Sequence, residues 1–365
     1  MSSPVAKRLS TLGSLLHGVY EYNVLRRFRR VPLRQLVIDV TYRCNSRCVM
    51  CSIWSAEPQP ELTLAQFATL LADPLFRGVE RLMLSGGEPT LRPDLVELVE
   101  ACFECMPSLF SLSLITNGLA PDRVISLYGD IARRCAERGI RLSISVSLDG
   151  VGEIHDRMRN IPNAFAKVEQ TLEGLGQLRK KYGFYLGVGC VVCHLTLPHL
   201  QTLADWCLQR DVDLGYQLVG FHDTYVNNIA QQSVLDFTED DRPALHALLQ
   251  RLASGRSLRN PMASYWADML HMYAKGRPRQ SPCAFLVDSL VLDAAGNIRV
   301  CETAANIGNC LESGSCSKLY FSEKASAMRS AMKSGACLNC NSGCMVNIAW
   351  RKDLFKYLGF LMRGG

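Results

Sequence analysis

The chain repeats a short apolar segment followed by a longer amphipathic one, and this alternation limits its fold more than any other feature. Six strand-like segments lie at residues 35–41, 81–85, 109–116, 141–148, 184–192 and 214–220. Helix-like segments follow the first five, at residues 62–71, 93–105, 121–138, 164–182 and 198–209. Regular alternation of this kind predicts an α/β fold with a parallel sheet, either doubly wound or curled into a barrel.

Three cysteines follow the first predicted strand, Cys44, Cys48 and Cys51, with the spacing C-x3-C-x2-C. Thiolates are soft ligands that select zinc, copper(I) or iron–sulfur clusters. A structural zinc site needs four protein ligands, and this loop has neither a fourth cysteine nor a histidine. Three thiolates on a four-iron cluster would leave one iron open to a substrate or cofactor. The loop therefore predicts an incomplete metal cage that takes part in chemistry.

Composition excludes several other classes of protein. The 365 residues are 48% hydrophobic and 20% charged, which is typical of a chain that buries a core. The net charge is +6 without a basic run interleaved with aromatic residues, so we expect no nucleic-acid partner. We find neither an uncharged stretch of membrane-spanning length nor a secretory signal. The 16 cysteines group in pairs and triplets, which favours metal binding in a reducing cytoplasm over a disulfide scaffold.

Polar turns follow the next three predicted strands as well. They are Gly86-Gly87-Glu88-Pro89, Thr116-Asn117-Gly118 and Ser147-Leu148-Asp149-Gly150. Two glycines permit close approach of the backbone, and the carboxylate beside them can hold an ammonium group. Each turn alone is ordinary, but successive strand ends of a parallel sheet meet on one face. We therefore expect all three turns to converge with the three cysteines.

Taken together, the cysteines and turns resemble the radical S-adenosylmethionine (radical SAM) superfamily over roughly residues 35–220. The resemblance implies a partial (β/α)6 barrel and a [4Fe–4S] cluster on Cys44, Cys48 and Cys51. It also implies that one electron, from a flavodoxin or ferredoxin, cleaves SAM to a 5′-deoxyadenosyl radical that abstracts a substrate hydrogen. Chemistry of this kind belongs to the cofactor, while the protein orients the reactants and excludes water.

The resemblance assigns further residues to SAM: Met50, Gly86, Gly87, Glu88, Ser147 and Arg159. The methionine would lie near the adenine, and the glycines with the glutamate would hold the methionine ammonium group. The serine and arginine would hold the methionine carboxylate and the ribose, because an arginine matches a carboxylate in geometry. Arg157 is an alternative for the arginine, or it forms an ordinary surface ion pair.

The C-terminal region resembles the SPASM/twitch extension of the same superfamily, which carries auxiliary iron–sulfur clusters. The pattern is Cys283-x12-Gly296-x4-Cys301 followed by Cys337-x2-Cys340, with a predicted hairpin at residues 286–301 and a helix near 322–333. The resemblance implies that the four cysteines hold one auxiliary [4Fe–4S] cluster. A structural zinc ion on the same residues is the alternative from spacing alone.

Here the chain departs from the longer SPASM pattern, because only Cys344 follows Cys340. Cys344 is the substitute if one of the four assigned ligands is wrong. Whether Cys310, Cys316 and Cys344 hold a second auxiliary cluster is left open. Six other cysteines are interpreted as small buried apolar residues: Cys102, Cys105, Cys135, Cys190, Cys193 and Cys207.

Glu302 directly follows a predicted cluster ligand. Some SPASM relatives that oxidise an alcohol or thiol carry an acidic base there, so Glu302 is the candidate catalytic residue; a solvated acid is the alternative.

Only about 34 residues precede the predicted barrel, too few for a peptide-recognition domain. We therefore favour oxidation of a small-molecule, sugar or lipid-linked substrate. A peptide- or protein-modifying maturase, and a non-catalytic iron–sulfur electron-transfer protein, are the alternatives.

The predicted organisation has five parts: a basic amphipathic segment (1–34), the barrel (35–220), a helical connector (221–282), the auxiliary-cluster domain (283–345) and a basic amphipathic helix (346–365). Leu12, Leu15, Leu16 and Val19 form an apolar stripe at one end, and Trp350, Leu354, Leu358 and Leu361 form one at the other. Basic amphipathic helices can lie on an anionic membrane surface. The alternative is that both helices pack against the body of a cytoplasmic protein.

Overall fold

The structure is a computed structural model that describes residues 16–57, 59–257 and 260–362. Its internal contacts divide the chain into two compact units that interleave in sequence. The sheet unit comprises residues 33–238 and 289–326. The helical unit comprises residues 1–32, 239–288 and 327–365.

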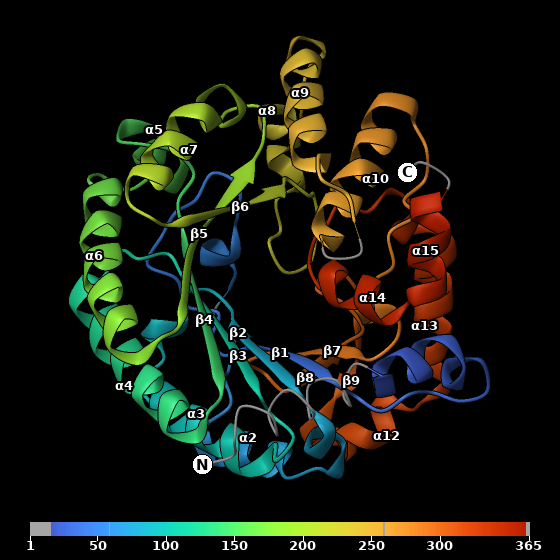
Figure 1. Cartoon of the computed structure of the whole chain (residues 1–365). Helices are drawn as coiled ribbons and strands as arrows, with labels where there is room; N and C mark the ends of the chain where they lie inside the picture. The colour runs from blue at the N-terminus through green and yellow to red at the C-terminus, as the bar shows by residue number, and fades with distance from the viewer. Residues whose placement is uncertain (1–15, 58, 258–259, 363–365) are drawn as a thin grey trace. The chain divides into compact units, whose positions relative to one another are not determined.

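The sheet unit is built on one nine-stranded sheet in the order β6-β5-β4-β3-β2-β1-β7-β8-β9 (Figure 1). The first six strands are β1 (Gln35–Asp39), β2 (Arg81–Ser85), β3 (Ser111–Thr116), β4 (Arg141–Ser147), β5 (Tyr185–Val192) and β6 (Asp213–Leu218). Each pairs in parallel with its neighbour in the chain. In the described sheet, β6 and β9 stand at the two ends of the order and do not pair with each other. The barrel is therefore open, as the predicted partial (β/α)6 fold requires.

Helices of the sheet unit fill the crossovers, with α4 and α6 lying along one side of the sheet (Figure 1). Their bounds are α2 (Leu64–Leu71), α3 (Leu95–Cys105), α4 (Pro121–Arg138), α5 (Glu153–Arg159), α6 (Ala164–Tyr182), α7 (Leu200–Gln209), α8 (Gln232–Leu235), α11 (Cys310–Ser313) and α12 (Cys316–Tyr320). Local signals explain the ends of α4. Proline suits its first position, and Gly139 ends it in the left-handed conformation (φ 67°).

Three strands from the C-terminal half complete the sheet: β7 (Ser289–Leu292), β8 (Asn297–Arg299) and β9 (Asn306–Asn309). The predicted hairpin is confirmed, since β7 and β8 pair antiparallel. Sequence analysis did not predict that β7 pairs in parallel with β1, placing Ser289 opposite Gln35. An unpaired edge of β1 would expose a row of backbone donors and acceptors, and β7 satisfies them. All five residues of β1 are buried as a result.

The helical unit holds residues 16–23 and η1 (Leu25–Arg27) together with α9 (Arg242–Ala253), α10 (Pro261–Lys275), most of α13 (Glu323–Ser334), α14 (Val346–Lys352) and α15 (Leu354–Met362). Buried polar contacts join its separate segments. The Tyr22 hydroxyl donates to Asp288 Oδ1 (2.8 Å), and Lys352 Nζ lies 2.7 Å from Asp288 Oδ2. In the described part of the chain, no helix has the length and apolarity needed to cross a bilayer.

Candidate functional site

The loop with three cysteines (residues 44–51, the cysteine loop) follows β1 and is fixed to the end of α5. The Arg47 N–H donates to the Arg159 carbonyl (3.2 Å), and the Val49 N–H donates to the Met158 carbonyl (2.9 Å). The last carbonyls of a helix have no partner within the helix and are free to accept such bonds. The loop therefore takes its shape from α5, which follows the fourth strand.

Polar groups surround the sulfur atoms of the cysteine loop. Arg159 Nη1 donates to Cys48 Sγ at 3.4 Å, and Ser46 Oγ lies 3.0 Å from the same sulfur. Burial raises the pKa of the Cys44 thiol to about 11 and that of the Cys51 thiol to about 12, with neighbouring thiols adding to the effect. Without a metal these two groups are neutral thiols at neutral pH, so iron binding would displace their protons.

The glycines of the second turn are required by the path of the chain itself. Gly86 has φ +128°, and a Cβ there would lie 2.4 Å from the Thr41 carbonyl oxygen. On Gly87 a Cβ would lie 2.2 Å from the Arg43 carbonyl oxygen. Only glycine lets this turn approach the segment that leads into the cysteine loop. Contact of either glycine with SAM stays a prediction.

Glu88 is buried and accepts several hydrogen bonds from the turns around it. Thr90 Oγ1 donates at 2.7 Å, Thr116 Oγ1 at 2.9 Å and the Asn117 N–H at 2.6 Å. Burial raises the pKa of the Glu88 carboxyl, and these donors oppose that rise. The turn after β3 thus positions the carboxylate supplied by the turn after β2. Asn117 Nδ2 also lies 3.8 Å from Cys44 Sγ, which connects Glu88 to the cysteine loop.

The fourth turn supplies the partner of Arg159. Arg159 Nη2 lies 2.7 Å from Asp149 Oδ2, and both side chains are buried. His155 Nδ1 accepts from the Asp149 N–H (3.1 Å), and burial, aided by the Arg159 charge, lowers the pKa of His155 to about 2. Sequence analysis gave Asp149 no role. The sequence feature that could have revealed this role is the acidic residue in the Ser-Leu-Asp-Gly turn, which precedes Arg159 in the chain. Ser147 ends β4 beside this turn.

Met50 lies in a buried apolar cluster with Cys48, Met158, Cys193, Val219 and Leu235. Asn228 Nδ2 donates to the Met50 carbonyl (3.0 Å), so the segment after β6 helps to hold the cysteine loop.

A cavity of about 320 Å³ lies beside the loop and is lined by Val49, Ile154, Arg157, Met158, His194, Leu195, Pro198 and His199. Arg157, the alternative arginine, is exposed in this wall, whereas Arg159 is buried against the cysteines.

Glu302 lies beside a buried ion pair at the ends of β1 and β8. Arg299 Nη2 lies 2.7 Å from Asp39 Oδ2 and 3.8 Å from Glu302 Oε2. Burial raises the pKa of Glu302 to about 7, against the opposing charge of Arg299. The Tyr225 ring lies under the Arg299 guanidinium (5.7 Å), and its hydroxyl donates to the Gly86 carbonyl (2.6 Å). Tyr225 thus connects the Gly86 turn to the group around Glu302.

Four C-terminal cysteines belong to the helical unit: Cys283, Cys337, Cys340 and Cys344. Arg279 Nη1 donates to Cys340 Sγ at 3.3 Å. Burial raises the pKa of the Cys283 thiol to about 11, and Cys340 and Cys337 contribute to that rise. Cys301, the remaining predicted auxiliary ligand, belongs to the sheet unit, so the set of four ligands stays a prediction. Over the described ranges, no three His, Cys, Asp or Glu side chains are grouped as ligands of a metal ion.

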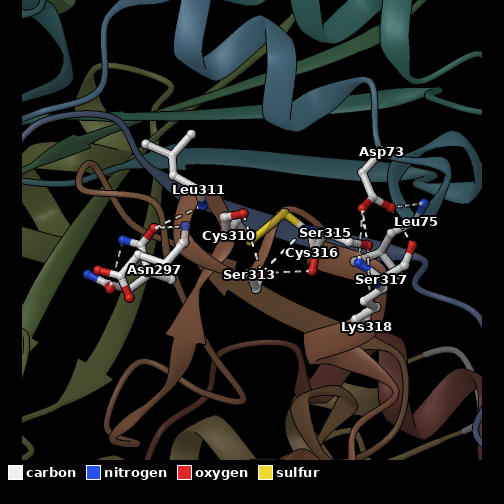
Figure 2. Close-up of a disulfide and its surroundings, with 12 residues drawn as sticks. Asp73, Leu75, Asn297, Cys310, Leu311, Ser313, Ser315, Cys316, Ser317 and Lys318 are labelled. Carbon is white, nitrogen blue, oxygen red and sulfur yellow. Dashed lines mark hydrogen bonds between the residues drawn. A yellow bond between two sulfur atoms is a disulfide. The ribbon is translucent and has the colours of Figure 1, made fainter.

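Cys310 and Cys316 are joined to each other in a disulfide, with their Cα atoms 5.0 Å apart (Figure 2). Asp73 anchors the same segment, accepting from Ser315 Oγ (2.9 Å) and from the Ser317 N–H (3.1 Å). Sulfurs bonded to each other cannot serve as thiolate ligands. In this state the two cysteines do not hold a second auxiliary cluster, the option that the sequence left open.

Comparison with known proteins places this site in a family. Residues 38–206 match the model of the Radical SAM superfamily. Pre-heme d1 synthase of Dinoroseobacter shibae is 31% identical over 207 residues, 56% of this chain and 48% of the relative. GTP 3′,8-cyclase of Acidothermus cellulolyticus is 40% identical over 126 residues, 32% of each chain. The chain thus spans about half, or less, of the length of these curated relatives.

Solved structures share the fold over most of the chain. SuiB of Streptococcus suis bound to S-adenosylmethionine has a TM-score of 0.58 at 13% identity, covering 95% of this chain and 80% of SuiB. The protein anSMEcpe with bound AdoMet has a TM-score of 0.57 at 17% identity, covering 91% and 93%. The part of the chain that contains the cysteine loop and strands β2 to β5 thus matches the radical SAM superfamily.

Proposed function

We propose that this chain is a radical SAM oxidoreductase that cleaves SAM reductively and removes a hydrogen atom from a small-molecule, sugar or lipid-linked substrate. The observation that carries the proposal is the surroundings of Cys48. Its sulfur accepts from Arg159, and Asp149 neutralises that arginine in a buried site. Donors on a cysteine sulfur stabilise an iron–sulfur cluster, so the residues fit the group that the family implies.

The residues of the sheet unit divide the binding tasks. Cys44, Cys48 and Cys51 would hold three irons of a [4Fe–4S] cluster, which when bound delivers one electron to SAM and yields a 5′-deoxyadenosyl radical. Nε of Arg159 is buried without a hydrogen-bond partner in the described chain and would receive the methionine carboxylate, beside Ser147. Glu88 Oε2 accepts from Asn117 and retains capacity for the ammonium group.

Oxidation of a substrate alcohol or thiol requires a hydrogen atom, a proton and an electron to leave it. The hydrogen atom would pass to the 5′-deoxyadenosyl radical. The proton would pass to the Glu302 carboxylate, whose side chain is 24% exposed and therefore accessible, unlike the fully buried Asp39. The electron would pass to an auxiliary [4Fe–4S] cluster held by Cys283, Cys301, Cys337 and Cys340. Loss of the proton makes the carbon radical easier to oxidise.

A peptide substrate is the second candidate. One solved structure with the same fold is described as SuiB bound to the precursor peptide SuiA, at a TM-score of 0.51 and 14% identity. That likeness supports the fold alone. Three curated relatives are named for pre-heme d1, GTP and Fe-coproporphyrin III, which are small molecules. We therefore place the small-molecule class first.

We further propose a flavodoxin or ferredoxin as the reductant, approaching the cysteine loop from the side of the cavity. Val49, between two of the cysteines, forms part of the cavity wall with His194 and His199. Exposed Arg47 and Arg157 flank the same region. Positive charge beside a partly apolar hollow favours docking of an acidic protein.

The experiment is anaerobic reconstitution with iron and sulfide, reduction by dithionite, and measurement of 5′-deoxyadenosine from SAM. We expect its formation in the natural chain and none in Cys48→Ala. Lack of 5′-deoxyadenosine in a chain with confirmed iron and sulfide would overturn the enzyme proposal in favour of an electron-transfer protein. The same reaction with lipid, sugar and peptide extracts, read by mass spectrometry for loss of two hydrogens, identifies the substrate class.

Glu302→Gln tests the proposed base. The amide keeps the size of the side chain but cannot take a proton, so we expect SAM cleavage to continue while formation of the oxidised product is lost. Glu302→Asp is the matched control and should retain part of the product. Unchanged product formation in Glu302→Gln would show that Glu302 is an ordinary solvated acid.

A further inference from the structure

Large apolar side chains are exposed along the N-terminal segment of the helical unit. Leu16, Tyr20 and Val24 are spaced four residues apart, so they share one side of the helical segment, and all three are exposed. Phe28, just past η1, is 81% exposed. Single exposed apolar residues are common, but a stripe of four on one segment indicates a contact surface.

The last described helix, α15, carries a second exposed stripe. Phe355 (67% exposed), Leu358 and Met362 (81% exposed) recur at helical spacing. Tyr357 and Phe360 on the same helix are buried. Packing within the unit thus uses one side of α15 and leaves another apolar side in contact with solvent.

The two stripes belong to segments that are bonded to each other. Asn23 Nδ2 donates to the Lys352 carbonyl at 2.9 Å, and Arg26 Nη2 lies 3.0 Å from Asp353 Oδ2. Residues 16–28 and α15 are therefore held in one body.

The exposed charged side chains of these two segments all have the same sign. Within residues 16–30 and 346–362 the acids are Glu21 and Asp353, and both are buried. Five exposed side chains in these segments are basic: Arg26, Arg27, Arg29, Arg351 and Lys356. Exposed apolar side chains ringed by arginine and lysine match the chemistry of an anionic lipid surface. A second copy of this surface would instead bring like charges together.

We propose that the helical unit docks peripherally on an anionic lipid bilayer through this surface, with Phe28, Phe355 and Met362 entering the interface. The basic side chains would bind lipid phosphates. The inference does not depend on the proposed chemistry, because it rests on residues outside the sheet unit. If both hold, the enzyme would work beside a lipid-linked substrate.

Cosedimentation of the full chain with vesicles tests the surface. We expect binding to phosphatidylcholine vesicles that contain phosphatidylglycerol, weak binding to phosphatidylcholine alone, and loss of binding as salt rises. The double variant Phe28→Glu with Phe355→Glu should bind at least about tenfold more weakly. Arg27→Glu and Arg29→Glu should each reduce binding to the anionic vesicles by about fivefold or more, leaving binding to neutral vesicles unchanged.

Leu208→Glu is the matched control, because Leu208 is also 81% exposed but lies on α7 of the sheet unit. It should bind vesicles like the natural chain.

The proposal is overturned if the natural chain binds neither vesicle, or if Leu208→Glu loses binding to the same extent. A dimer in light scattering that Phe28→Glu converts to a monomer, with no effect of vesicles, would assign the surface to a second copy instead. Formation of 5′-deoxyadenosine without vesicles should be equal in all these variants, which separates this test from that of the enzyme.

Discussion

Two cysteine-rich regions of this chain each have an arginine on a sulfur, but they balance its charge differently. In the sheet unit, Arg159 donates to Cys48 and is paired with the buried carboxylate of Asp149. In the helical unit, Arg279 donates to Cys340 Sγ and to the carbonyls of Cys340 and Ser342. No carboxylate forms an ion pair with Arg279 in the described chain.

This contrast indicates which counter-charge each arginine requires. The charges of Arg159 and Asp149 cancel before any cluster is bound. The Arg159 Nε–H, which has no hydrogen-bond partner in the described chain, can therefore donate to another anion. Arg279 is half-buried, and Cys283 and Cys340 are the groups that most raise its pKa against burial, ahead of Tyr265 and Asp268. A buried cation without a counter-charge is costly. Thiolates bound to a cluster would supply that charge, which favours metal binding by the C-terminal cysteines.

The largest expected effect separates the two regions by their function. Cys48→Ala should abolish 5′-deoxyadenosine formation, because the first cluster loses a ligand. Cys340→Ala should lower the iron content yet retain SAM cleavage, and lose only formation of the oxidised product. Iron analysis and product analysis on both variants check this. Equal loss of SAM cleavage in the two would contradict the division of roles.

Removing the counter-charge of Arg159 tests the first half of the comparison. Asp149→Asn leaves a buried arginine unpaired, so we expect the free energy of unfolding to fall by about 3 kcal/mol. Urea unfolding followed by circular dichroism measures it. Glu169→Gln is the control, since its pair with Arg210 (3.2 Å) is exposed and should contribute less than about 1 kcal/mol. Similar losses in both variants would refute a special role for Asp149.

Changing Arg279 tests the second half. Arg279→Gln removes a positive charge beside Cys340, so the reduction potential of the auxiliary cluster should fall by about tens of millivolts. Arg279→Lys, which keeps the charge, should shift it less. Potentiometric titration followed by electron paramagnetic resonance reports both clusters. A shift confined to the cluster on Cys44, Cys48 and Cys51 would contradict the assignment.

The smallest effect concerns cysteines that belong to neither region. Changing both Cys310 and Cys316 to alanine removes a disulfide that closes a short loop, so stability should fall by about 2 kcal/mol. Iron content and SAM cleavage should stay as in the natural chain. A loss of iron in this double variant would show that the two sulfurs serve as cluster ligands after all.

Local patterns were sufficient to predict most elements of the sheet unit. The predicted strand at 81–85 and the predicted helices at 121–138 and 164–182 have the observed bounds, because proline, glycine and apolar periodicity are all local signals. Cysteine spacing singled out the cysteine loop, and the role of its three thiols as cluster ligands stays a prediction. Predictions about Leu12 and Leu15 lie outside the described residues. Placement of SAM and of the auxiliary ligands remains predicted.

Contacts between distant segments could not be predicted in this way. The Tyr225 hydroxyl on Gly86 and the pairing of β7 with β1 each join residues that no local pattern relates. They follow from the way the curved sheet brings its strand ends together. A single sequence contains the side chains of such pairs without a sign that they meet.

The pairing of β7 with β1 also has a consequence for biosynthesis. Gln35 leaves the ribosome long before its partner Ser289, so the sheet cannot be completed until most of the chain has been made. Until then β1 has an open edge, and nascent chains with open edges tend to aggregate. Contacts between such distant residues also slow folding. Insertion of iron and sulfide at Cys44, directly downstream of β1, would therefore be most productive after the last third of the chain has emerged.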